Sequence, residues 1–222
     1  MVCRPASAAR LGATGLTGEP RRLILASASS RRQELLRTLG LDFVVVPSEA
    51  TELCHPQLTA RELCLANARR KALAVAKRFP EDLVLGADTL VSLGTTLFGK
   101  PTDRAAAARM LARLARRSHL VVTGVCLMHF GRRHERRFAV ATLVAFRPLT
   151  PRQIRAYLTA INPLDKAGAY AIQEHGEAII AGISGSYSNV VGLPLERLRA
   201  ELAAWPGGAG LLRSGGRAVD RR

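Results

Sequence analysis

The sequence predicts an α/β fold, because short apolar segments with strand character alternate with segments of helical periodicity. We expect residues 23–26 to form the first strand, residues 31–39 the first helix and the valine-rich residues 43–46 the second strand. The 222 residues, 48% of them hydrophobic, are enough for one compact domain or for two small lobes that share a core.

The next helix is expected to begin near Thr59, which together with Glu62 has the spacing of a capping box. One apolar stripe with helical spacing follows, made of Leu65, Ala68, Ala72, Val75 and Phe79. A strand over residues 83–86 comes after this helix, so the alternation continues.

The middle of the chain predicts one more helix and a pair of strands. Asp103 is expected to cap an alanine-rich helix that runs to about residue 117, with Met110, Leu111 and Leu114 on its apolar side. Two segments with strand character follow and are expected to form a β-hairpin or two neighbouring strands, residues 120–128 and 137–146.

Pro151 is expected to start a further helix and Asp165 to cap a short one, before a last strand over residues 178–183. Residues 1–21 and 206–222 are rich in small residues and arginine and match no packed element, so we expect both to be disordered. The folded domain is therefore expected to span residues 22–205.

No apolar run approaches the roughly 18 residues that a membrane-spanning helix needs, so we expect a soluble protein with no membrane partner. The four cysteines, Cys3, Cys54, Cys64 and Cys126, lack the paired spacing of a zinc site or a disulfide framework. They are expected to be reduced thiols in a cytoplasmic protein.

The net charge of +16 comes mainly from arginine and is typical of proteins that bind polyphosphates or nucleic acids. A nucleic-acid platform would also need aromatic side chains among the arginines, and only 5% of the residues are aromatic. A genomic preference for arginine would give the same charge without a function. We therefore expect no dedicated nucleic-acid partner.

The segment 23–36 places small hydroxyl residues and two arginines where a strand leads directly into a helix. The first amides of a helix and the positive end of its dipole favour anions, and Arg31 and Arg32 add planar donors that suit phosphate oxygens. Ser27 and Ser29 belong to the same junction. The alternative is an ordinary helix start with two solvated arginines.

A second segment, residues 83–91, leads a strand into Asp88 through a Gly-Ala pair that permits close backbone approach. Functional side chains of α/β proteins gather at strand ends, although a single aspartate there more often forms a turn. A third segment, residues 164–173, ends at Gln173, whose amide suits contact with a nucleobase.

These segments, with Phe-Gly-Lys-Pro at 98–101 and the string at 183–195, resemble the signatures of the Maf family in the same order. The family pattern Ala-Ser-x-Ser-Pro-Arg-Arg-x-Glu-Leu-Leu differs here only at its proline, which is Ser30; with Gln33, this serine has capping-box spacing. The resemblance covers roughly residues 22–203. It implies an elongated mixed sheet flanked by helices, two lobes with a central cleft, and frequently a homodimer.

The resemblance also implies a nucleoside triphosphate substrate that is cut between its α and β phosphates, giving a monophosphate and pyrophosphate. Asp88 then corresponds to the proposed proton acceptor, and Glu52 and Asp88 are the ligands expected for a divalent cation, Mg²⁺ or Mn²⁺. If Asp88 binds the cation, its role changes from direct base to assisting a water that the cation activates. Taken alone, Glu52 and the mid-helix Lys71 would be solvated side chains. The residues that we expect to bind phosphate are Ser27, Ser29, Arg31, Arg32, Lys71 and Lys100.

Within the Maf family, threonine after the aspartate and glutamine near the end of the third segment are typical of the subgroup that acts on dTTP and UTP. Arg31, Thr89 and Gln173 are therefore the residues expected to determine substrate specificity. A glutamine donates and accepts at once, as the edge of thymine or uracil requires. The alternatives are a pyrophosphatase for 7-methyl-GTP and a non-catalytic regulator of septum formation.

Overall fold

The computed structural model describes residues 22–208 and contains one seven-stranded mixed sheet, in the order β2-β1-β3-β5-β6-β7 with β4 paired to β3. The strands are β1 (Leu23–Leu25), β2 (Phe43–Val45), β3 (Leu83–Leu93), β4 (Thr96–Phe98), β5 (Ser118–His129), β6 (His134–Phe146) and β7 (Ile180–Ser184). β1 runs parallel to β2 and β3, and the other pairs are antiparallel, which confirms the predicted mixed sheet. Residues 1–21 and 209–222, for which we predict disorder, lie outside the described residues.

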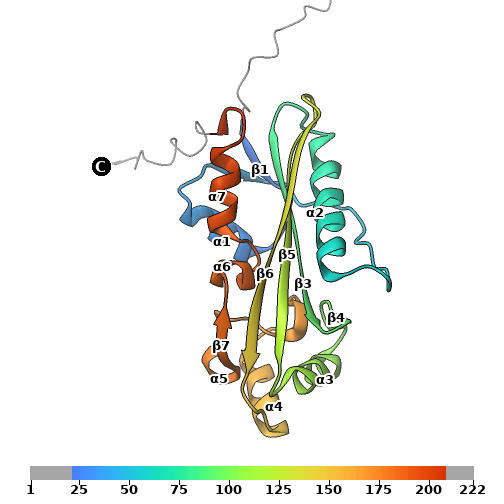
Figure 1. The fold of residues 1–222 in the computed structure, drawn as a ribbon, viewed down its shortest axis with the longest axis vertical. Helices are drawn as coiled ribbons and strands as arrows, with labels where there is room; N and C mark the ends of the chain where they lie inside the picture. The colour runs from blue at the N-terminus through green and yellow to red at the C-terminus, as the bar shows by residue number, and fades with distance from the viewer. Residues whose placement is uncertain (1–21, 209–222) are drawn as a thin grey trace, which may run out of the picture.

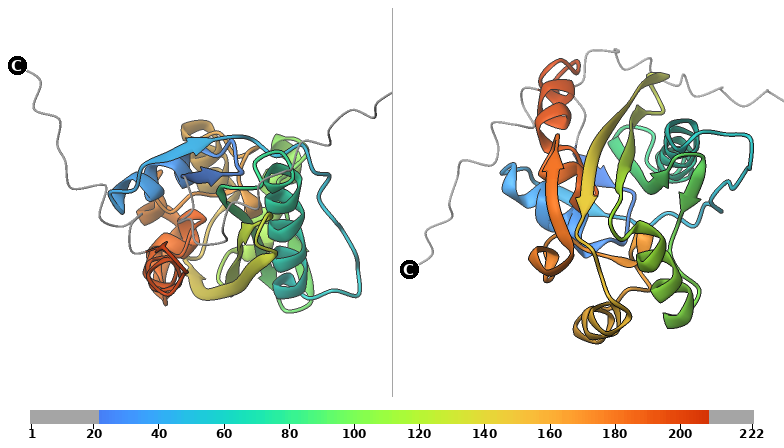
Figure 2. Two further views of the ribbon diagram at one scale, coloured as in Figure 1. Left: turned by 90° about the horizontal axis from the view of Figure 1, so that it is seen from above. Right: turned by 60° about the horizontal axis from the view of Figure 1, so that its bottom comes forward.

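Helices cover the sheet on both faces. They are α1 (Ser30–Thr38), α2 (Ala60–Ala76), α3 (Arg104–Leu114), α4 (Pro151–Ala160), the 3₁₀ helix η1 (Ala167–Ala169), α5 (Gly176–Ile179), α6 (Tyr187–Val191) and α7 (Leu195–Ala203). The long helix α2 lies against one face along β3 and β5, and α1 and α7 lie on the other (Figure 1 and Figure 2). Within residues 22–208, no helix combines the length and hydropathy that crossing a bilayer demands.

Buried side chains divide the molecule into two lobes. In the upper lobe of Figure 1, α1 and α7 pack on one side of the sheet and α2 on the other. In the lower lobe, α3, α4 and η1 pack around Phe146 and Tyr170. The long strands β3, β5 and β6 pass through both lobes (Figure 1). The two-lobed, elongated sheet that the resemblance implies is therefore what the chain adopts.

Two glycines allow α2 to lie very close to the sheet. A Cβ atom at Gly86 of β3 would collide with the main chain of Ala68, and one at Gly124 of β5 would collide with the main chain of Cys64. A strand glycine often marks such an approach of another backbone. Asp88 pairs with Gly124 across the two strands, so it lies where α2 comes close to the sheet. Polar side chains of α2 can therefore reach it.

Strand β3 is longer than predicted, because it continues from Leu83 to Leu93 and does not end at Gly86. Its antiparallel pairing with β5 is unbroken from Val84 to Ser92. Asp88 therefore lies in the middle of a strand and is only 5% exposed. The prediction of a carboxylate at a strand end is wrong, because the ladder to β5 extends the strand past it.

Most of the predicted helix starts are confirmed: Thr59 with Glu62 for α2, Asp103 for α3 and Pro151 for α4. The first helix is capped one residue earlier than predicted. The hydroxyl of Ser29, and not that of Ser30, accepts a hydrogen bond from the amide of Arg32. The predicted capping box between Ser30 and Gln33 is therefore absent from this helix.

Asp165 was expected to cap a short helix, and this prediction is wrong. Its carboxylate instead accepts hydrogen bonds from Arg31 and Lys166, and η1 starts with no side-chain cap among the described residues. Two other boundaries shift slightly: α3 ends at Leu114, and β7 begins at Ile180. These differences leave the order of the predicted elements unchanged, but β4, α5, α6 and α7 were not predicted.

Candidate active site

A cleft between the two lobes brings together every predicted site residue except Ser27. The residues from this set that line it are Ser29, Arg31, Arg32, Glu52, Lys71, Asp88, Thr89, Lys100 and Gln173. Ser27 lies just behind the wall, where its hydroxyl accepts a hydrogen bond from Arg32. Residues from six separate segments of the chain thus meet in one place, as the resemblance implies.

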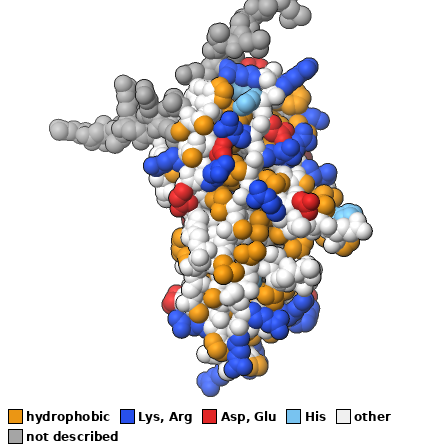
Figure 3. Space-filling model, viewed as in Figure 1, with side chains coloured by type: hydrophobic (Ala, Val, Ile, Leu, Met, Phe, Trp, Pro, Cys, Tyr) orange, Lys and Arg blue, Asp and Glu red, His pale blue; other side chains and the backbone are white. Residues whose placement is uncertain are grey.

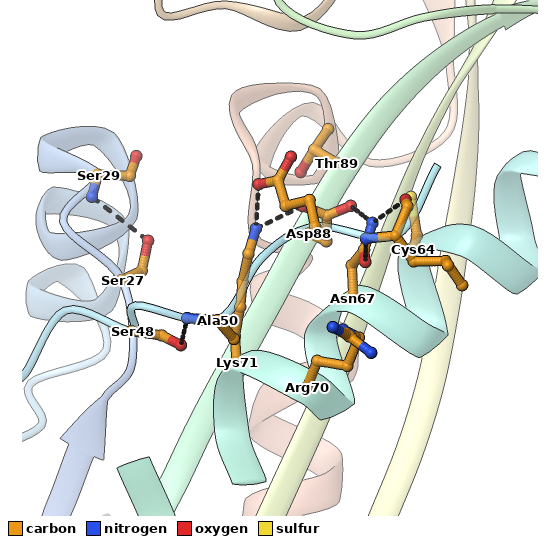
Figure 4. Close-up of polar contacts among 12 residues, drawn as sticks. Ser27, Ser29, Ser48, Ala50, Cys64, Asn67, Arg70, Lys71, Asp88 and Thr89 are labelled. Atoms are coloured by element: carbon orange, nitrogen blue, oxygen red, sulfur yellow. Dashed lines mark hydrogen bonds and ion pairs between the residues drawn. The ribbon is translucent and has the colours of Figure 1, made fainter. Parts of the chain in front are cut away.

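Lys71 lies between two carboxylates in this cleft. Its Nζ atom is 2.6 Å from Asp88 Oδ1 and 2.6 Å from Glu52 Oε1. The side chain of Lys71 is 14% exposed, so it does not lie on the solvent-facing side of α2 as an isolated mid-helix lysine would. Figure 4 shows it reaching from α2 to Asp88. The close approach of α2 to β3 makes this contact possible.

Glu52 lies on the segment between β2 and α2, and its charge is stabilised by its neighbours. Partial burial raises the pKa of Glu52, but the hydrogen bond and charge of Lys71, with the charges of Lys100 and Arg32, lower it overall. Glu52 therefore stays ionised beside Lys71, with half of its side chain in contact with solvent.

Arg32 is held in place by three protein acceptors. Its Nε donates to the main-chain oxygen of Gly192 at 2.9 Å, Nη1 to Ser27 Oγ at 3.2 Å and Nη2 to Thr89 Oγ1 at 3.0 Å. A guanidinium has five N–H groups, so two remain for a ligand in the cleft. Burial lowers the pKa of Arg32, and the charge of Asp88 opposes this effect. Arg32 is thus a fixed cation in the cleft wall.

Arg31 is held much less firmly than Arg32. It reaches across the cleft to Asp165, with Nη1 3.2 Å from Oδ2 and Nη2 3.1 Å from the main-chain oxygen. The two side chains are 20% and 53% exposed, and ion pairs so open to solvent contribute little stability. A phosphate group can therefore replace Asp165 as the partner of Arg31.

Besides its charged groups, the cleft lining includes apolar side chains and an exposed amide. The apolar residues include Val91, Tyr170 and Ile172, and Gln173 follows Ile172 in the chain. The Gln173 amide makes no hydrogen bond to any other residue within 22–208, so both of its polar atoms are available to a ligand. The hydroxyl of Tyr170 lies 2.8 Å from Nε2 of His119, and burial lowers the pKa of His119 to about 4.

Asn67 is a site residue that the sequence motifs did not reveal. Its Nδ2 donates to Asp88 Oδ2 at 3.3 Å and to the main-chain oxygen of Leu53 at 3.1 Å, and its Oδ1 accepts from the Leu53 amide at 2.6 Å. Asn67 thereby joins Asp88 to the segment that carries Glu52. The one feature of the sequence that could have revealed Asn67 is its position one helical turn before Lys71, on the same side of α2 (Figure 4).

The described cysteines, Cys54, Cys64 and Cys126, are free thiols as predicted, and Cys3 lies outside the described residues. Cys64 is buried near Asp88. Burial, with the charge of Asp88, raises the pKa of Cys64 to about 12. Since the thiolate is the reactive form, Cys64 is a packed thiol and not a nucleophile of this cleft.

The family model for Maf-like proteins matches residues 22–205. A solved structure of a HAM1 protein from Coxiella burnetii has 18% identity and a TM-score of 0.34, and covers 56% of this chain and 72% of its own. A dTTP/UTP pyrophosphatase of Moorella thermoacetica is 50% identical over 182 residues, which are 82% of this chain and 94% of that protein. One from Gloeobacter violaceus is 49% identical over 180 residues, 80% of this chain and 92% of that protein. The family model and these relatives show that the chain belongs to the Maf family.

Proposed function

We propose that this chain is a nucleoside triphosphate pyrophosphatase that converts dTTP and UTP to the monophosphate and pyrophosphate. The observation that supports this best is the contact of one ammonium group, on Lys71, with both Asp88 and Glu52 in a cleft lined by Arg31 and Arg32. A proton acceptor beside a cationic wall suits the cleavage of a phosphoanhydride. The names of the two relatives, both dTTP/UTP pyrophosphatases, support the same activity.

The triphosphate would lie along the start of α1. The amides and dipole at this helix end favour anions, and Ser29 places the helix start in the cleft wall. The two free N–H groups of Arg32 and the exposed cation of Lys100 add fixed and mobile donors. Arg31 joins them once phosphate replaces Asp165 as its partner.

Asp88 would accept the proton of the attacking water. Lys71 donates to its Oδ1 and Asn67 to its Oδ2, and each carboxylate oxygen retains a second lone pair. As the water oxygen bonds to phosphorus, the bond from phosphorus to the leaving pyrophosphate breaks and the proton passes to Asp88. The nearby cations stabilise the charge that develops on the phosphate oxygens.

Glu52 and Asp88 are the residues that would hold a divalent cation, Mg²⁺ or Mn²⁺. Lys71 Nζ contacts both carboxylates at once, so the two groups are close enough to share one cation. Two carboxylates with phosphate oxygens and waters are a donor set that Mg²⁺ prefers. When bound, such a cation neutralises triphosphate charge and makes a coordinated water more acidic.

The preference for dTTP and UTP would depend on Gln173. Its unpaired amide in the cleft lining can donate to O4 and accept from N3–H of thymine or uracil. Thr89 would contribute indirectly, since its hydroxyl already bonds Arg32 and Thr123. A carboxylate in place of this amide would only accept hydrogen bonds, so it would suit a guanine edge, where N1–H and N2–H both donate, better than thymine or uracil.

Pyrophosphate release from a panel of nucleotides with Mg²⁺ or Mn²⁺ tests the activity. We expect dTTP and UTP to be turned over fastest, and Asp88→Asn to lower kcat by about 10³, within the usual range for a general base. Asp42→Asn, at an exposed position outside the cleft, is the matched control. Release of phosphate alone, full activity of Asp88→Asn or no turnover of any nucleotide would contradict the proposal. Faster turnover of 7-methyl-GTP would favour the second subgroup.

Gln173→Glu tests the assignment of the base-binding residue. The carboxylate keeps the size of the amide but loses its donor, so the ratio of kcat/KM for dTTP over 7-methyl-GTP should fall about tenfold, because the guanine edge offers two donors and the thymine edge only one. Gln57→Glu, exposed and outside the cleft, adds the same charge as a control. An unchanged ratio in Gln173→Glu would show that Gln173 does not bind the base.

We also propose a cytoplasmic homodimer, in line with the sequence resemblance. Leu120 and Leu143 face each other on β5 and β6 and are 40% and 42% exposed, so they are candidates for an interface. On the face shown in Figure 3, apolar side chains gather between two regions rich in lysine and arginine. Light scattering after size-exclusion chromatography tests the oligomeric state, and a monomer at all concentrations would contradict the dimer.

A further inference from the structure

A row of polar groups runs from Arg32 into the protein interior behind the cleft. Arg32 Nη2 is 3.0 Å from Thr89 Oγ1, and this hydroxyl is 3.0 Å from Thr123 Oγ1. Thr123 Oγ1 is in turn 3.1 Å from the main-chain oxygen of Asn189. Thr89 and Thr123 are directly paired residues of β3 and β5, and Thr123 is fully buried.

The two ends of this row determine the direction of every hydrogen bond in it. A carbonyl oxygen only accepts, so Thr123 must donate its single hydroxyl proton to Asn189. Thr123 must then accept the hydrogen bond between the two threonines, so Thr89 donates its only hydroxyl proton to Thr123. A guanidinium only donates, so Thr89 is the acceptor for Arg32. Thr89 therefore has no proton left to donate to a substrate.

Residues 189–192, which include Asn189 at the end of this row, also contact Arg32 directly. Asn189 lies in α6, where its Nδ2 donates to Val121 and Thr142 at 3.0 Å each and fixes the helix against the sheet. Gly192, directly after α6, accepts the Nε–H group of Arg32 at 2.9 Å. Two main-chain oxygens of one segment thus act on this guanidinium, one directly and one through Thr123 and Thr89.

We propose that Thr123 is a positioning residue that acts on Arg32 through Thr89. By fixing the direction of the Thr89 hydroxyl, it fixes where the two free N–H groups of Arg32 point in the cleft. Thr89 then influences the substrate through Arg32 and not by contacting the base. This inference rests on the proposed function, in which those two N–H groups bind the triphosphate.

A buried threonine also stabilises a fold, so the test must separate positioning from stability. Thr123→Val keeps the shape of the side chain and removes its hydroxyl. Ser92→Ala is the control, because it removes a buried hydroxyl from β3 that hydrogen-bonds neither Thr89, Arg32 nor Asn189 among the described residues. Thr123→Ser restores the hydroxyl, and the midpoint of thermal unfolding reports the stability of each variant.

A double-mutant cycle on kcat/KM for dTTP gives the decisive comparison. We expect Thr123→Val and Thr89→Val each to lower kcat/KM about tenfold, as the loss of a hydrogen bond to a charged group suggests. The double variant should be no worse than Thr89→Val alone, because both changes break the same row. Thr123→Ser should stay within about threefold of the wild type. Losses that multiply in the double variant, or a Thr123→Ser variant as impaired as Thr123→Val, would overturn the inference.

The Nε–H signal of Arg32 in a ¹⁵N NMR spectrum provides a readout without substrate. It should shift in Thr123→Val and stay in place in Ser92→Ala. No shift in Thr123→Val would show that Thr123 does not act on Arg32. Wild-type turnover, measured in parallel, separates the two proposals: an inactive wild type contradicts the proposed function, whereas an active wild type with multiplying losses contradicts only the role of Thr123.

Discussion

The two ends of the cleft differ in how much of their polar chemistry is satisfied by the protein itself. At the Asp88 end, Lys71, Asn67 and Arg32 all make several hydrogen bonds to other side chains or to the main chain. At the Gln173 end, the lining includes the apolar side chains of Tyr170 and Ile172, and the Gln173 amide is unpaired among the described residues. The reacting groups are therefore preorganised before substrate binds, while the base-binding end is left for the ligand to satisfy.

This difference follows from where each end lies in the fold. The Asp88 end is built on β3 and α2, which the glycines Gly86 and Gly124 bring together. The Gln173 end is a loop after η1, and its position depends on Tyr170, whose ring packs in the lower lobe. Changes at the first end should therefore affect turnover most, and changes at the second should affect stability or selectivity.

The largest effect is expected for Lys71→Met. This substitution keeps the length of the side chain but leaves Asp88 and Glu52 without their shared cation. Both negative charges would then face the triphosphate, and we expect kcat/KM to fall by about 10³, or about 4 kcal/mol. Lys77→Met, at the exposed end of α2, is the control. A loss below about tenfold would contradict the central place of Lys71 in the site.

At the other end, His119 should make stability depend on pH. Burial lowers its pKa from 6.5 to about 4, so below pH 6.5 the unfolded chain binds a proton that the folded chain does not. The contribution of His119 to stability is present above pH 6.5 and should fall by about 3 kcal/mol as the pH drops to 4.

Urea unfolding at pH 7 and pH 4 measures this effect. His119→Gln keeps an acceptor for the hydroxyl of Tyr170 but cannot be protonated in this range. Its free energy of unfolding should therefore decrease less than that of the wild type between the two pH values. Equal decreases in the two proteins would show that His119 is not buried as a neutral side chain.

The two adjacent arginines give a smaller contrast within one end of the cleft. Arg32→Lys cannot reproduce three hydrogen bonds in fixed directions, so we expect kcat/KM to fall about 30-fold. Arg31→Lys keeps a mobile charge at a position where the native contact is weak, and we expect a loss of about threefold. Equal losses, measured as pyrophosphate release from dTTP, would remove the distinction between a fixed and a mobile arginine.

The sequence predicted the order of the strands and helices up to residue 183 apart from β4 and α5, and the resemblance named most of the polar residues that meet in the cleft. These predictions succeeded because periodicity, capping residues and glycines act locally. It could not distinguish Arg31 from Arg32, since their partners Asp165 and Gly192 are far away in the chain. The mid-strand place of Asp88 was also hidden, because it depends on pairing with β5.

Asn67 and Thr123 escaped prediction for a related reason. An asparagine in a helix and a threonine in a strand have no local feature that marks a functional role. Their importance depends on the distances to Asp88 and Thr89, and tertiary packing sets those distances. Side chains that contact a reacting group from behind can be found only after the fold is known.

Asp165→Asn is expected to have the smallest effect, and unlike the other substitutions it should strengthen substrate binding. The change weakens the competitor of phosphate for Arg31, so KM for dTTP should fall about two- to threefold with little change in kcat. Glu174→Gln is a close control, because Glu174 also pairs with Lys166 and is not a hydrogen-bond partner of Arg31. Steady-state kinetics at low and high salt add a second check, since the gain should shrink as salt screens the exposed pair. A higher KM in Asp165→Asn would mean that Asp165 orients Arg31 for the substrate, and the contact across the cleft would then be part of the binding site and not its competitor.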